Sequence, residues 1–87
     1  MPTVLRKDGF EVRIRLPPRE HPPPHVHVHK AGGMLIVNLP DGDRPLVVRE
    51  IDHMRDGDVT AAIHLVQAHA EHLIVMWRRY HGLSQTD

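Results

Sequence analysis

The last third of the chain carries one apolar stripe at helical spacing, and this stripe constrains the fold more than any other feature. Apolar residues recur at intervals of four and three from Val59 to Tyr80, and no Gly or Pro interrupts them. The spacing predicts one long helix over about residues 58–81, with Asp56 or Asp58 as its cap. At a rise of ~1.5 Å per residue, such a helix is about 36 Å long. It needs one apolar surface to cover its stripe.

Residues 3–50 supply that surface, because they show the period-two pattern of half-buried strands. Apolar and charged residues alternate from Phe10 to Leu16, and Val26 and Val28 alternate with histidines. Turn-forming Gly and Pro separate these runs. We therefore predict an α+β fold, in which a small antiparallel β-meander of four or five strands packs against the C-terminal helix.

The length of the chain leaves room for one domain. We place this domain at residues 1–82 and expect residues 83–87 to fray. A core of this size is marginal, which favours a homodimer or another partner. The chain has no Cys, no apolar signal-peptide core and no apolar run that could span a membrane. These features predict a non-membrane protein of the reducing cytoplasm.

The charges of the chain balance, with 11 Lys+Arg against 11 Asp+Glu, but they are unevenly distributed. Residues 1–30 carry six basic and three acidic side chains, whereas the remainder carries five basic and eight acidic ones. A protein that bound nucleic acid over its whole surface would be more basic. The gradient leaves room for a local cationic face that binds phosphate.

Nine histidines are the compositional outlier, and three of them alternate with valines at His25, His27 and His29. Alternate strand residues point the same way and lie roughly 7 Å apart. Two imidazoles at that spacing can bind one metal ion, such as zinc, nickel or iron. Glu20 and His21, held close by a proline run, are the candidates for the remaining ligands.

The same histidines also support an interpretation without metal. His25 and His27 can serve as general base and general acid. Arg13 and Arg15 would share their face and bind a phosphate, provided that the two strands are neighbours. RNA brings its own nucleophile, the 2′-hydroxyl, so a site of this kind needs no Ser or Cys.

A third interpretation is an interaction module without catalysis. In this case the sheet edge or the helix binds a small protein, and the histidines are bystanders or pH sensors. His64, His69 and His72 lie off the apolar stripe and are expected at the surface or at the stripe edge. Trp77 and Tyr80 lie on the stripe and are expected in the core.

The run from Glu20 to His27 resembles the EH-x-PPH-x-H motif of the bacterial family catalogued as domain of unknown function 4160. The opening MPTVLRKDGF and the helix end at Trp77–Gly82 are similar as well, so the resemblance covers most of the chain. The match to the family motif implies that the site residues are Glu20, His21, His25 and His27. Arg13 and Arg15 depart from the more aromatic pattern of relatives, so their role rests on strand geometry alone.

The resemblance implies a function only through the genes that lie beside those of the family. Genes of this family often lie beside those of domain of unknown function 2442, in an arrangement similar to toxin–antitoxin pairs. By that association, the resemblance implies that the protein is one half of such a module and that its partner is a small cognate protein of that second family. The leading hypothesis is thus a site in which His25 and His27 act on RNA while His21 and Glu20 orient them. Metal binding and pure interaction remain the alternatives.

Overall fold

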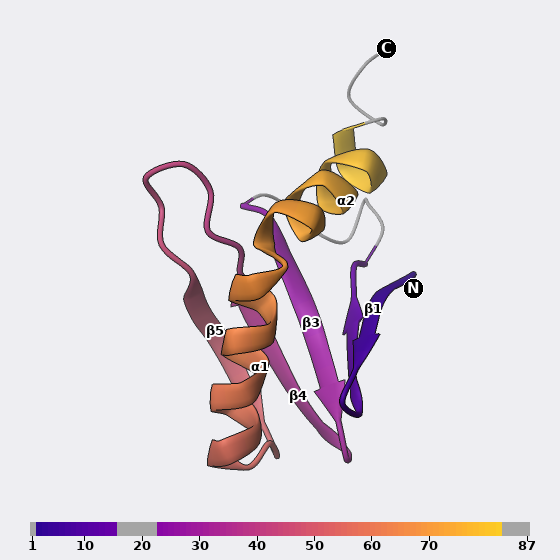
Figure 1. The fold of residues 1–87 in the computed structure, drawn as a ribbon, viewed down its shortest axis with the longest axis vertical. Helices are drawn as coiled ribbons and strands as arrows, with labels where there is room; N and C mark the ends of the chain where they lie inside the picture. The colour runs from indigo at the N-terminus through magenta and orange to yellow at the C-terminus, as the bar shows by residue number, and fades with distance from the viewer. Residues whose placement is uncertain (1, 16–22, 83–87) are drawn as a thin grey trace.

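The computed structural model describes residues 2–15 and 23–82, so the expected fraying of residues 83–87 lies outside it. Within the described residues, five strands precede two helices: β1 (Thr3–Lys7), β2 (Phe10–Arg13), β3 (His25–Lys30), β4 (Gly33–Asn38), β5 (Val47–Asp52), α1 (Asp56–Ala68) and α2 (Ala70–Gly82). The strands form one antiparallel sheet in the order β1-β2-β3-β4-β5. Both helices lie on the same side of this sheet (Figure 1). The predicted α+β meander is confirmed.

The core lies between the helices and the apolar face of the sheet. Val12, Val28 and Leu35 are cross-strand partners, and each has 0% exposure. Directly opposed residues of an antiparallel pair point to the same face, so these three side chains form a continuous apolar row. The helices add four buried side chains to the cluster: Ala62, Val66, Leu73 and Trp77.

The helical segment is broken, and the prediction of one long helix over residues 58–81 is wrong in this detail. His69 separates α1 from α2 with φ −114° and ψ 18°. Its Nδ1 lies 3.0 Å from the carbonyl oxygen of Leu65, and its backbone N–H is shared between the carbonyls of Leu65 and Val66. A side chain that enters the backbone hydrogen-bond ladder kinks a helix without Gly or Pro. Neither helix of the described chain is long and apolar enough to cross a membrane.

The start of α1 also differs from the prediction. Arg55 is the N-cap residue, and no side chain caps the helix. Asp56 and Asp58, the expected caps, instead lie in the first turn, where the helix dipole favours carboxylates. Oδ1 of Asp58 lies 3.3 Å from Nζ of Lys30, so this acid ties α1 to the end of β3.

Both edge strands of the sheet pair irregularly. The β1–β2 register shifts between Thr3 and Leu5, and the β4–β5 register shifts between Ile36 and Val37. Both edges also carry charged residues. Bulges and charges on edge strands hinder the addition of further strands. The sheet is therefore built to end at β1 and β5.

The core makes a first prediction, which uses one chemical change at two sites. Val66→Ala should lower the free energy of unfolding by roughly 2 kcal/mol, because Val66 is fully buried and its methyl groups leave a cavity. Val75→Ala is the control, since Val75 is 54% exposed on α2 and both changes gain the same helix propensity. Urea unfolding measures both variants. Equal stability of the two would contradict this packing of α1.

Candidate functional site

The histidines of β3 are the centre of the candidate site. Val26 and Val28 point into the core, so His25 and His27 alternate to the other side of the strand. Nevertheless, each histidine is only 3% exposed. Their rings lie edge to face, with centroids 5.6 Å apart. The strand therefore holds two imidazoles close together and away from bulk water.

His25 has a defined hydrogen bond. Its Nδ1 lies 2.9 Å from the carbonyl oxygen of Pro23, and a carbonyl only accepts. Nδ1–H is therefore the donor, which leaves Nε2 of the neutral ring with a lone pair. A ring oriented in this way can bind a metal ion or take up a proton at Nε2.

Helix α2 brings the ring of Trp77 beside His25, and a second ring stacks on Trp77. The ring centroid of Trp77 lies 6.4 Å from that of His25, and the ring of His81 stacks on Trp77 at 4.0 Å with an interplanar angle of 6°. His81 is itself 3% exposed, and its Nε2–H donates to the carbonyl of Arg15 at 2.8 Å. Sequence reasoning placed Trp77 in the core correctly. It gave His81 no role, although the spacing of four from Trp77 puts both on one side of the helix.

The two predicted phosphate-binding arginines are placed differently. Arg13 is the direct cross-strand partner of His27, so the two strands are neighbours as the prediction required. Its guanidinium, however, donates to Oε1 of Glu11, with Nε at 2.7 Å. This contact lowers the pKa of the Glu11 carboxyl. Arg15 follows the end of β2 with an exposed side chain and contributes its backbone carbonyl to the contact with His81.

The third histidine of β3 belongs to the charged end of the strand. His29 lies directly across the β2–β3 ladder from Glu11. Burial, followed by the positive charge of Arg13, lowers its pKa. Its Nε2 is inaccessible to solvent and has no hydrogen-bond partner among the described residues.

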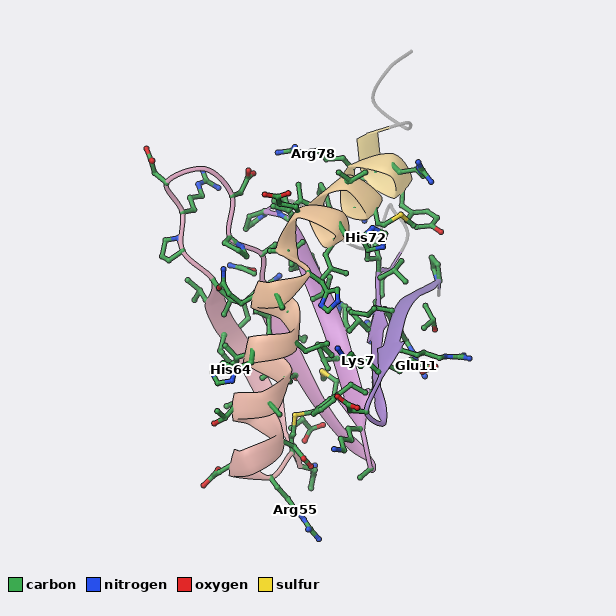
Figure 2. The ribbon with its side chains drawn as sticks, in the orientation of Figure 1. Lys7, Glu11, Arg55, His64, His72 and Arg78 are labelled. Carbon is green, nitrogen blue, oxygen red and sulfur yellow. The ribbon has the colours of Figure 1, made fainter. Side chains whose placement is uncertain are left out.

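Glu20 and His21, the other predicted site residues, lie outside the described residues. In the part of the chain that is described, no three His, Asp or Glu side chains are grouped so that they could bind one metal ion. His64 and His72 are exposed on the helices, as predicted, and Figure 2 shows where they lie. His69 is half-buried at the kink.

The fold and the site define a small α+β protein with a buried pair of histidines on its central strand. The chain belongs to the family described as Domain of unknown function (DUF4160), whose family model matches residues 9–78. This range contains β2 to β5, α1 and most of α2, but it ends before His81. No curated protein and no solved structure matches the chain.

The contact of His81 makes a second prediction. His81→Ala should lower the free energy of unfolding by about 2 kcal/mol, because it removes a hydrogen bond and a stacked ring. His81→Phe should lose less, since it keeps the ring. His72→Ala, at an exposed position of the same helix, is the control. Urea unfolding followed by the fluorescence of Trp77, the one tryptophan of the chain, measures all three. The contact would be refuted if His81→Ala unfolded like the control.

The environment of His29 makes a third prediction, about pH. Its folded-state pKa lies below the ordinary value of 6.5, so the folded protein binds fewer protons than the unfolded chain between these two values. Stability should therefore fall as the pH drops through 6.5 toward the lowered pKa. His29→Gln should flatten this dependence, whereas His64→Gln at an exposed position should not. Urea unfolding at several pH values, with a chelator present, tests this. Parallel curves for wild type and His29→Gln would contradict it.

Proposed function

We propose that His25 and His27 form the centre of a divalent-metal site, for zinc, nickel or iron. The observation that carries the proposal is the paired geometry of the two rings, with centroids 5.6 Å apart. Two imidazoles whose nitrogens bind one ion at ~2.0–2.1 Å have ring centroids about 5 Å apart. The spacing of 5.6 Å in the pair is close to this value.

The hydrogen bond of His25 supports the same proposal. Metal-binding histidines usually donate their second ring N–H to a carbonyl or carboxylate, which sets the orientation of the ring. His25 already has this arrangement with Pro23. Glu20 and His21, from the proline-rich motif, would be the further ligands; both lie outside the described residues. In this proposal the protein works in the cytoplasm as a metal-dependent enzyme or a metal-responsive regulator.

Asn38 gives an independent reason to place a polar group at this end of the sheet. It is the cross-strand partner of His25, and its Oδ1 is buried with no hydrogen-bond partner among the described residues. An acceptor left in this state costs about 1–3 kcal/mol. A water molecule bound to the metal would donate to it and remove this cost.

A second candidate function is acid–base chemistry on RNA, as in the toxin–antitoxin hypothesis. The direct pairing of Arg13 with His27 favours it, because a phosphate at Arg13 would lie beside an imidazole. Two observations place it second. Glu11 already accepts hydrogen bonds from Arg13, and both His25 and His27 are too buried for RNA to reach without local opening. A cognate protein partner or a homodimer is compatible with either candidate.

The test is the thermal stability of metal-free protein with and without Zn²⁺, Ni²⁺ or Fe²⁺. A ligand that binds only the folded state at 100 times its Kd stabilises by about 2.7 kcal/mol, which for a domain of this size raises Tm by roughly 10–20 °C. The rise should disappear in His25→Ala and in His27→Ala and persist in His64→Ala. Elemental analysis of untagged protein gives the stoichiometry, and circular dichroism shows whether each variant is folded.

The two candidates give different outcomes in this experiment. A wild-type Tm that none of the three ions changes would reject the metal site. RNA cleavage by the metal-free protein, lost in folded His25→Ala, would then support the second candidate. If the protein neither binds metal nor cleaves RNA, the interaction module remains.

A further inference from the structure

A second site lies at the opposite end of β3, between two hairpin turns. The β1–β2 turn has positive φ at Asp8 and Gly9, and the β3–β4 turn has positive φ at Ala31 and Gly32. Because β2 and β3 are neighbours, both turns lie at the same end of the sheet (Figure 1). A hollow of about 640 Å³ lies between them. This is within the usual size range of small-molecule sites.

Two lysines line the hollow from the helix side. Lys7 is paired across the β1–β2 ladder with the core residue Phe10, and Figure 2 shows Lys7 on this hairpin. Nζ of Lys30 lies 4.3 Å from the centroid of the Phe10 ring and 3.3 Å from Asp58. A Cβ atom at Gly9 would lie 3.4 Å from Cε of Lys30, so this side chain reaches across to the neighbouring turn. Lys7 and Lys30 thus line one hollow from adjacent hairpins.

The balance of charge leaves these lysines able to bind an anion. Lys7 forms no ion pair with any described residue, and the pair with Asp58 leaves further donors on Lys30. On the other face, Arg6 lies 3.1 Å from Glu11, a carboxylate that also accepts from Arg13. Two guanidinium groups therefore share one carboxylate. With Lys7 and Lys30 they give four positive charges at this end of the sheet, against the three carboxylates of Asp8, Glu11 and Asp58. A Cβ atom at Gly32 would meet no atom within 4 Å, so the turn backbone is open to a ligand.

We propose that this hollow binds the phosphate group of a nucleotide, with Lys7 and Lys30 as its cationic ligands. Ammonium groups bind phosphate as point charges, and a hollow of this size has room for the attached nucleoside. The site does not depend on the metal site at His25 and His27. The nucleotide is either free or part of a single-stranded RNA, and the chemistry of the phosphate is the same in both.

The test is an amide NMR titration of the whole protein with inorganic phosphate, with uridine monophosphate and with an eight-nucleotide single-stranded RNA. The amide signals of Gly9 and Gly32 should shift, and Lys7→Gln should weaken binding about tenfold, the loss expected for one charge-assisted contact. Arg49→Gln is the matched control, because Arg49 is an exposed cation on the far edge strand β5. Lys30→Gln is the second variant. Its fold is checked separately, because the substitution also removes the ion pair with Asp58.

The titrations distinguish the source of the phosphate. Binding of uridine monophosphate as tight as that of RNA would identify a free nucleotide as the ligand. Tighter binding of RNA that weakens steeply with salt would identify the nucleic acid. The proposal is overturned if no nucleotide shifts Gly9 and Gly32, or if Arg49→Gln weakens binding as much as Lys7→Gln does.

Discussion

The alternation of valine and histidine along β3 is the constraint on which the rest of the structure depends. β3 is the middle strand of five, so pairing on both sides defines its register. A slip of one residue would replace Val26 and Val28 in the core with histidines. Both valines are fully buried, so the slip would lose their apolar contacts and would bury imidazoles in an apolar environment. The pattern that specifies the sheet is thus also the pattern that brings the histidines together.

The kink at His69 links this sheet to the site. A straight helix of about 36 Å would extend well past strands of six residues, which span about 20 Å. With the break, α2 changes direction and crosses near the start of β3 (Figure 1). Trp77 then reaches His25, and His81 reaches the backbone of Arg15. The hydrogen bond of His69 to Leu65 is therefore what lets the second half of the helical segment reach His25.

These elements also show what could be predicted from the sequence. Period-two alternation was sufficient for the meander, and it put Arg13 on the face of the histidines, where the structure pairs it with His27. The kink could not be predicted from the sequence. It depends on one hydrogen bond between the His69 side chain and the carbonyl of Leu65, and the apolar stripe of the helix continues through it without a break. The contact of His81 with Arg15 joins residues 66 positions apart and exists only after the layers pack. The pairing of Arg13 with Glu11 could have been expected, since strand residues two apart share a face.

The two ends of β3 differ in chemistry, and this bears on what the protein can bind. From His25 to Lys30 the strand spans about 17 Å, beyond the distance over which substitutions usually couple. One end is buried and suits a small ion, whereas the other is open and cationic and suits an anion. The side chains of His25 and Lys30 also point to opposite faces of the sheet, because the two residues are five positions apart on one strand. One RNA strand would have to pass from one face of the sheet to the other to contact both sites, which favours two separate ligands over one polymer.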